Sequence, residues 1–487
     1  MKDIKSLISE FVSYALNNKM IEDIDVIYVI NTLEGILKLE EDVNYKYQKD
    51  TRIIDDILDD FVSFAVDKKL TDEGNISHDL YDTMIMDTVT PYPSTVVKTF
   101  FDLYHKDKKE ATNYFYNLMI ASNYIRLNRI KKNIGFTYKS EYGDMLITIN
   151  LSKPEKDPRD IAKLKLMKSS SEKYPKCLLC YENMGFVGNM NLQARNNLRV
   201  IPVELNGEQF YMQYSPYIYY NEHCIVFKRE HEDMKINDDT FRRLLDFVDF
   251  LPHYFLGSNA DIPIVGGSIL VHEHYQGGSF RFPLDDAKVR YEKVINGVKV
   301  RYLAWPLDTI ELVSPNKEEV LNLAFRIHSL WRKYRNEKIN IIDKDEEGIH
   351  NTITPIARRD NGNYVLKLVL RNNKTTKEYP YGLYHPSEDL HHIKKENIGL
   401  IEVMGLAILP ARLKEELKII DEILKGKRSE DDINLVPNHK DWYNELKDKK
   451  DVNINDEVGK KFVKVLECCG VFRYGTTQDV IKFIETI

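Results

Sequence analysis

The chain has 487 residues, of which 43% are hydrophobic and 11% aromatic. A chain of this size and apolar content can bury a large core, so its composition excludes wholesale disorder. Its 69 basic and 76 acidic residues give a net charge of −7. This balance argues against nucleic acid or an anionic membrane as the main partner, because both attract proteins with a basic excess.

Targeting and redox features favour the cytoplasm. The first 25 residues are interrupted by charges and lack the apolar stretch of a secretory signal. No uncharged apolar run reaches the roughly 18 residues that a membrane span needs. The five cysteines are too few for a disulfide framework in so long a chain. We therefore expect a reduced, cytoplasmic protein without a membrane segment.

The first segment, residues 1–135, is expected to form a helical domain. Its apolar residues recur at the i, i+3, i+4 spacing of a helix. Residues 8–20 and 58–70 also align with each other without gaps, sharing Phe, Val, Ser, Ala and Lys at matching places. One duplication is too short for a solenoid. We expect two similar amphipathic helices in an accessory domain.

From residue 136 the pattern changes to alternating, β-branched segments. These segments predict antiparallel strands at 145–151, 197–205, 209–220 and 223–230. One helix interrupts them, with Asn237 or Asp238 as its N-cap and an apolar stripe behind it. An extended segment at 263–278, bounded by glycine pairs, closes this block.

A second mixed block follows and ends in a strongly charged tail. It predicts strands within 298–313 and 364–372 and a helix over 321–334. Two successive strand-rich blocks, each with a helix, predict an α+β protein with two similar halves. The expected division is therefore 1–135, 136–290 and 291–487.

The most specific segment for chemistry contains His272, His274 and Gln276. In one strand, these three side chains would point the same way, about 7 Å apart. Neutral imidazole is a nucleophile, a base and a metal ligand near pH 7. The flanking glycine pairs, 266–267 and 277–278, would let the backbone approach a phosphate closely. These neighbours favour a functional site over ordinary structural or surface histidines.

A second motif, Cys177-x-x-Cys180, has three interpretations. A thioredoxin-like redox pair would open a helix in a βαβ unit, and the flanking sequence does not show one. Half of a zinc site would need histidines to complete it, because the chain has no second C-x₂-C. The candidates are His223, His231 and His272. Zinc binding and two buried thiols both stay open on the residues alone.

The motif His272-x-His274-x-Gln276, with the C-x₂-C and a strand that ends at His231, resembles the histidine-triad (HIT) superfamily. Gln276 stands where the hydrolase branch has a third histidine, which is similar to the nucleotidyltransferase branch. Four segments resemble the bacterial second type of galactose-1-phosphate uridylyltransferase, and the resemblance extends over nearly the whole chain: 147–158, 214–227, 257–278 and 391–413. It implies two HIT-like antiparallel halves behind the helical domain.

The resemblance implies a double displacement with His274 and Gln276 as catalytic residues. His274 would attack the α-phosphorus of UDP-glucose, release glucose 1-phosphate and carry UMP until galactose 1-phosphate takes it as UDP-galactose. Gln276 would bind the phosphoryl oxygens, and no organic cofactor is needed. The more familiar enzymes have prolines beside this histidine, whereas this chain has Glu273 and Tyr275. The alternatives are a HIT-like phosphorylase or hydrolase acting on another nucleotide-linked substrate and, less favoured, a non-catalytic nucleotide-binding protein.

Further substrate contacts follow from the same resemblance. Lys153 and Lys156 are similar to a basic pair that contacts substrate phosphates, with lysine in place of arginine. Two solvated surface lysines are the alternative. Gly267 and Ser268 resemble a phosphate-binding turn, one residue out of register.

For a metal, the family pattern implies a closed structural Zn²⁺ site formed by Cys177, Cys180, His231 and His272, with His223 as the rival of His231. The familiar enzymes also have an iron-type site, which is not assigned here. His350, His391 and His392 are available for it, but the last two lie outside the matching strand and are expected to be surface or substrate-facing residues. The familiar enzymes build their site across a dimer, so a homodimer is expected.

Overall fold

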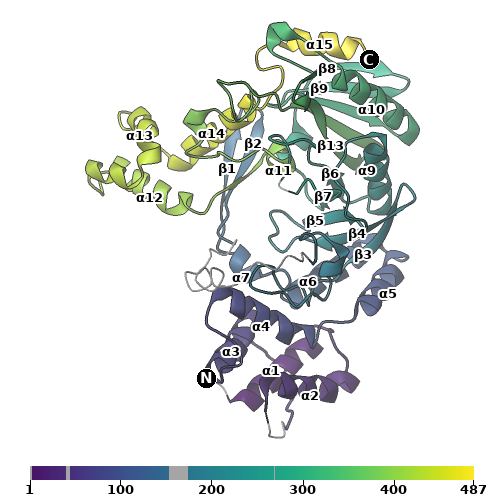
Figure 1. Ribbon diagram of the computed structural model, residues 1–487, viewed down its shortest axis with the longest axis vertical. Helices are drawn as coiled ribbons and strands as arrows, with labels where there is room; N and C mark the ends of the chain where they lie inside the picture. The colour runs from purple at the N-terminus through teal and green to yellow at the C-terminus, as the bar shows by residue number, and fades with distance from the viewer. Residues whose placement is uncertain (1–2, 40–43, 153–173, 268) are drawn as a thin grey trace.

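The computed structural model describes residues 3–39, 44–152, 174–267 and 269–487. Helices of the N-terminal segment gather at one end of the molecule, and a large sheet occupies its middle and other end (Figure 1). No helix in these described ranges is both long and apolar enough to cross a membrane. The N-terminal helices are α1 (Ile4–Asn17), α2 (Val26–Leu37), α3 (Ile54–Asp67), α4 (Asn75–Asp87), α5 (Pro93–Tyr104), α6 (Lys108–Ala121) and α7 (Leu127–Ile130).

The duplicated segments form α1 and α3, which confirms the expected pair of amphipathic helices. Each helix buries one apolar face, and the two helices pack on each other. Phe11 and Phe61 occupy matching places in the duplication, and their rings meet edge to face at 5.5 Å. The repeat therefore supplies both sides of one contact in the helical core.

The ten strands of the main sheet come in two sets of five. The first set, in spatial order, is β3 (Ile201–Leu205), β4 (Glu208–Tyr214), β5 (Cys224–Lys228), β7 (His274–Gly278) and β6 (Phe255–Gly257). The second is β13 (Asn351–Asp360), β14 (Asn363–Asn372), β10 (Thr309–Ser314), β9 (Val298–Leu303) and β8 (Val289–Ile295). All pairings between neighbours are antiparallel, and β6 joins β13 with Gly257 opposite Ile356. The predicted α+β class with two similar halves is confirmed.

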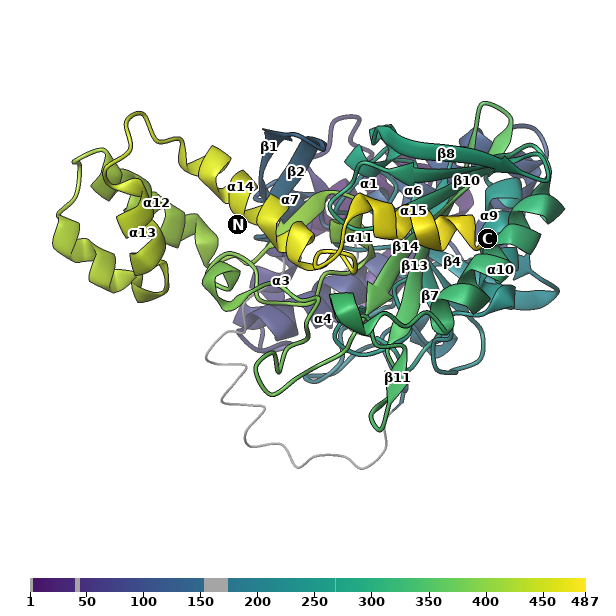
Figure 2. The ribbon, with the colours of Figure 1, turned by 90° about the horizontal axis from the view of Figure 1, so that it is seen from above.

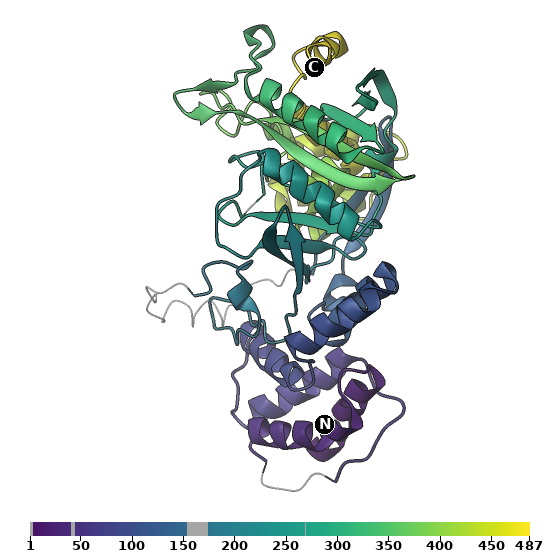
Figure 3. The same cartoon turned by 90° about the vertical axis from the view of Figure 1, so that its right-hand side faces the viewer.

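Helices cover one face of this sheet. The predicted cap is correct: α9 (Asp238–Phe250) begins after Asn237, whose side chain accepts a hydrogen bond from the Thr240 amide. Helix α10 (Lys317–Arg332) packs beside α9, and both contact β13 (Figure 3). Apolar residues of these two helices and of the sheet belong to the same core as the N-terminal helices.

The opposite face carries a second apolar core. A small sheet in the order β1 (Ile134–Ser140), β2 (Gly143–Ile149) and β15 (Leu406–Leu409) contributes to it. Helices α12 and α13 project away from the main sheet, as the view from above shows (Figure 2). The remaining elements are the short β11 (Lys344–Asp345) and β12 (Gly348–Ile349) and the helices α11 (Leu400–Val403), α12 (Leu413–Leu424), α13 (Lys440–Leu446), α14 (Ile454–Cys468) and α15 (Thr477–Glu485).

Several predicted strands are shorter in the structure, and the segments predicted at 197–205 and 223–230 shrink to Ile201–Leu205 and Cys224–Lys228. The strand expected over 209–220 ends at Tyr214, and the chain turns through Ser215 and Pro216, because proline cannot donate a ladder hydrogen bond. The extended segment 263–278 is a strand only from His274 onward. The turns place the described residues of 215–220, 258–267 and 269–273 outside the regular strands, next to the candidate site.

At the junction of the two half-sheets, Gly257 has no room for even one added methyl group. A Cβ at Gly257 would lie 2.9 Å from Leu400 Cδ1 and 3.1 Å from the Pro355 carbonyl oxygen. We expect Gly257→Ala to lower the free energy of unfolding by about 1–3 kcal/mol through overpacking. Gly35→Ala, in an exposed helical position with nothing within 4 Å, should instead raise it by about 0.5–1 kcal/mol. Urea titrations of both variants measure these free energies of unfolding. An unchanged unfolding midpoint for Gly257→Ala would contradict the overpacking.

Candidate functional site

Alternation along β7 separates its side chains between the two faces of the sheet. The Tyr275 hydroxyl donates to Glu273 Oε1 at 2.6 Å, and Arg243 Nη1 of α9 donates to both residues at 3.3 Å. Glu273 and Tyr275 therefore face α9, and His274 and Gln276 face the opposite side. The residues that stand where the familiar enzymes have prolines anchor the strand to a helix.

His272 lies outside the regular part of this strand. The last backbone bond between β5 and this segment runs from the Lys228 amide to the Glu273 carbonyl, one residue short of His272. The ring of His272 is on the expected side of the sheet, since it lies 6.0 Å from the ring of Phe227, which pairs directly with His274. The strand begins only at His274, however, so His272 is not part of its regular row. The His272 ring lies instead against the cysteine pair, with Nδ1 3.2 Å from Cys177 Sγ.

The geometry of His274 identifies its reactive nitrogen. Its Nδ1 lies 2.8 Å from the carbonyl oxygen of His272. A carbonyl oxygen only accepts, so Nδ1 carries the proton and Nε2 keeps its lone pair. Burial lowers the pKa of His274 to about 4. The ring is therefore neutral near pH 7, with one nucleophilic nitrogen.

Gln276 is partly buried and is held from the neighbouring strand. Its Oε1 lies 3.2 Å from Nε2 of His223, the residue directly before β5. His223 was the rival candidate for the metal site, but it contacts Gln276 and not the cysteines. An amide beside a nucleophilic imidazole can donate hydrogen bonds to the oxygens of a phosphoryl group.

The four residues implied for the metal site come together. The Cys177 and Cys180 sulfurs are 3.6 Å apart, and His231 Nδ1 lies 3.2 Å from Cys180 Sγ. All four donor atoms, including Nδ1 of His272, lie within 4.8 Å of one another. Zn–S bonds of about 2.3 Å in a tetrahedron place two sulfurs about 3.8 Å apart, so the cluster could hold a metal ion of this kind.

The second nitrogen of His272 supports the same assignment. Its Nε2 lies 2.8 Å from the carbonyl oxygen of Lys228 and therefore donates a proton to it. The Nδ1 lone pair is then directed at the sulfurs, as in metal-binding histidines whose other nitrogen is held by a carbonyl group. Burial raises the pKa of the Cys180 thiol to about 11. A bound dication would offset that effect, since it stabilises the thiolate.

Of the four residues predicted to contact substrate phosphates, only Gly267 lies within the described part of the chain. Lys153, Lys156 and Ser268 lie outside the described residues. Gly267 packs against Asn259, and a Cβ on Gly267 would come 2.5 Å from the Asn259 amide nitrogen. Asn259 Oδ1 in turn accepts from the backbone amide of Leu400 at 2.9 Å, so it ties this turn to α11. The sequence analysis missed Asn259, although a polar residue just after a strand and before a glycine pair is a usable signal.

The three histidines considered for an iron-type site do not come together among the described residues, although His350 lies with Asp345 and Glu347 in a group whose donor atoms are all within 4.8 Å of one another. His350 lies 2.8 Å from Asp345, whereas His391 contacts a backbone carbonyl in its own loop. His392 is buried, and its Nδ1 lies 2.8 Å from Nδ1 of His439. The expected surface or substrate-facing placement is therefore wrong for His392, which packs in the core between the C-terminal helices.

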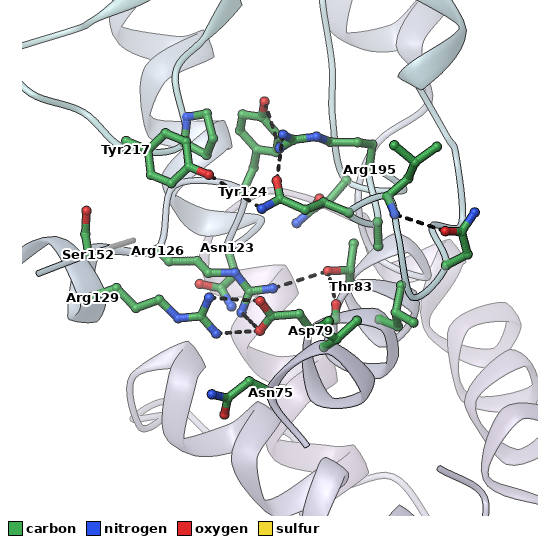
Figure 4. A pocket seen from close by; sticks show the side chains of 18 of the residues that line it. Asn75, Asp79, Thr83, Asn123, Tyr124, Arg126, Arg129, Ser152, Arg195 and Tyr217 are labelled. Carbon is green, nitrogen blue, oxygen red and sulfur yellow. Dashed lines mark hydrogen bonds and ion pairs between the residues drawn. The ribbon is translucent and has the colours of Figure 1, made fainter. Parts of the chain in front are cut away.

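A separate cavity of about 320 Å³ lies where the helical domain meets the first half-sheet (Figure 4). The helical domain contributes Arg126 and Arg129, both paired with Asp79. The loop 189–195 contributes Arg195, whose guanidinium lies over the Tyr124 ring. Neither His274 nor Gln276 lines this cavity.

Comparison with known proteins was made against families, curated sequences and solved structures. The family model "Galactose-1-phosphate uridyl transferase, N-terminal domain" matches residues 37–233, and the corresponding C-terminal model matches residues 247–444. A galactose-1-phosphate uridylyltransferase of Clostridium acetobutylicum is 48% identical over 99% of both chains. One of Caldanaerobacter subterraneus subsp. tengcongensis is 46% identical over 100% of this chain and 98% of its own. A crystal structure of yeast Ap4A phosphorylase Apa2 aligns with a TM-score of 0.32 and 11% identity, covering 70% of this chain and 92% of that one.

The anchoring of β7 to α9 predicts a stability effect from one hydroxyl. Tyr275→Phe removes the donor to the buried Glu273, so we expect the free energy of unfolding to fall by about 1–2 kcal/mol. Tyr291→Phe is a matched control, because its hydroxyl also donates to a glutamate, the exposed Glu485. The control should change stability by less than about 0.5 kcal/mol. Equal urea midpoints for the two variants would refute the anchoring role.

Proposed function

The chain belongs to the galactose-1-phosphate uridylyltransferase family, and from this premise we propose that it transfers UMP from UDP-glucose to galactose 1-phosphate. The observation that carries the proposal is the state of His274: a buried neutral imidazole with its proton on Nδ1 and a lone pair on Nε2. The full-length similarity to relatives named for this activity supports the choice of substrates.

The reaction then has two balanced displacements. In the first, the His274 Nε2 lone pair forms a bond to the α-phosphorus of UDP-glucose. The bond from that phosphorus to the bridging oxygen breaks, and glucose 1-phosphate leaves with the electron pair. In the second, a phosphate oxygen of galactose 1-phosphate attacks the same phosphorus, and the P–N pair returns to Nε2. The Nδ1 proton stays on the ring throughout, held by the His272 carbonyl.

Gln276 contributes to both displacements as a neutral donor. Its amide can bind the phosphoryl oxygens as charge develops on them, and it serves both steps because the same group is transferred twice. A carboxamide cannot accept a proton from water as an imidazole can. We infer that this difference favours transfer to a sugar phosphate over hydrolysis.

We propose that the metal cluster is a structural zinc site. Four protein ligands leave no open position, which is typical of structural zinc. The ion would fix the ring of His272, whose carbonyl orients His274. It would therefore hold the nucleophile in place without taking part in bond making.

Other features of the molecule remain our proposals. We infer a cytoplasmic protein, in line with five free cysteines, and a homodimer, as the resemblance implies. We also propose phosphate-binding roles for Lys153, Lys156, Gly267 and Ser268. The division into 1–135, 136–290 and 291–487 is consistent with a main sheet whose first five strands all precede its last five in the chain.

Trapping the covalent intermediate tests the reaction. UDP-glucose alone should release about one equivalent of glucose 1-phosphate per active site and leave UMP on His274, as peptide mass spectrometry would show. Adding galactose 1-phosphate should remove the adduct and yield UDP-galactose. His274→Gly should form no adduct and lose turnover while keeping the wild-type circular dichroism spectrum. Steady release of free UMP from the wild-type protein would indicate a hydrolase and contradict the transfer.

Elemental analysis tests the zinc site. Cys180→Ser should lose stoichiometric zinc and lower the melting temperature, because a closed site loses one of its four ligands. Cys224→Ser is a matched control, since Cys224 is buried outside the cluster, and it should retain the metal. Fully active wild-type protein without metal would overturn the zinc assignment alone.

A further inference from the structure

We propose that His223 is a positioning residue for the transfer, because it holds the Gln276 carboxamide with the oxygen turned away and the N–H groups available to the phosphoryl oxygens. The inference rests on the proposed function, in which Gln276 binds the group carried by His274. It also gives a role to the histidine that the metal cluster does not use.

The contact between the two side chains is built into the pairing of β5 with β7. In this antiparallel pair, Ile225 lies opposite Gln276 and Cys224 lies opposite Gly277. His223 directly precedes the strand and is only 2% exposed. Its Nε2 reaches Gln276 Oε1 at 3.2 Å across the ladder.

The proton distribution on His223 gives this hydrogen bond its direction. Nδ1 of His223 is buried and has no hydrogen-bond partner within the described part of the chain. A proton on Nδ1 would be a buried donor without an acceptor, which costs roughly 1–3 kcal/mol. The proton therefore belongs on Nε2, and its partner must be the amide oxygen, since an amide NH₂ group cannot accept. Gln276 Nε2 meets no acceptor among the described residues, so both its N–H bonds remain available.

The imidazole is fixed by its surroundings and stays neutral. The rings of Tyr219 and Tyr220 lie against it at centroid distances of 5.6 and 4.5 Å. The backbone is held on both sides, because Ser215 N donates to the His223 carbonyl and His223 N donates to the Tyr220 carbonyl. Burial lowers the pKa of His223 to about 4. The same single-proton form is thus present throughout the neutral pH range.

A fixed amide matters because a glutamine side chain can present either end at little cost. With the amide reversed, the carbonyl oxygen would face the phosphoryl oxygens and repel the charge that develops on them. Loss of a direct donor to such charge typically lowers kcat by about 10²–10³-fold. Loss of the group that orients a donor costs less, about 10–100-fold by analogy with residues that orient metal ligands.

Single substitutions of His223 distinguish the role of its N–H donor from the role of its aromatic ring. His223→Phe keeps an aromatic ring between the two tyrosines and removes the N–H. We expect the rate of adduct formation from UDP-glucose to fall about 10–100-fold, with KM within about threefold, because the loss concerns the transition state. His223→Gln restores an N–H donor and should recover part of the rate. His253→Phe replaces another histidine with one neutral hydrogen bond, to Thr112, and should leave the rate unchanged.

A double-variant cycle tests whether His223 acts through Gln276. If it does, His223→Phe should cost less than about threefold in a Gln276→Ala background, because no amide remains to be oriented. Multiplicative losses in the double variant, with an active wild-type protein, would overturn the role of His223 and leave the proposed function intact. A wild-type protein that forms no adduct would overturn the proposed function and this inference together.

Discussion

One hydrogen bond links the two chemical centres of this protein. The His272 carbonyl accepts the Nδ1 proton of His274, while the His272 ring faces the cysteine pair. The same residue therefore contacts the cysteine pair through its side chain and His274 through its backbone carbonyl. The strand begins only at His274, so His272 is outside the regular ladder, and its ring reaches the cysteines on the same side of the sheet.

The two faces of the sheet have different tasks. On one face, Glu273 and Tyr275 secure β7 to Arg243 of α9 inside an apolar core. On the other face, His274 and Gln276 form part of the candidate site. A buried ionic contact on the anchoring face costs desolvation, but it fixes one position of the strand. The imidazole of His274 is thus positioned from behind by a well-packed layer.

Motif spacing predicted the chemical groups well and their geometry less well. The C-x₂-C alone left zinc binding and two buried thiols open, and the four-residue cluster was anticipated only through the family resemblance. Motif spacing could not decide between His223 and His231, which flank the same strand. The pairing of β5 with β7 decides it, because His223 lies at the strand end beside Gln276 and His231 follows the opposite end. The buried contact of His392 with His439 depends on long-range packing and has no local signal.

The sequence by itself determined the α+β class, the duplicated helices and the cap of α9, because these depend on local periodicity and capping chemistry. The tertiary structure alone decided that the halves join through β6 and β13, and that His272 and His274 serve different centres. It also decided which nitrogen of His274 is free. These outcomes depend on contacts between residues distant in the chain or on where a ladder ends, and neither is encoded in the spacing of neighbouring residues.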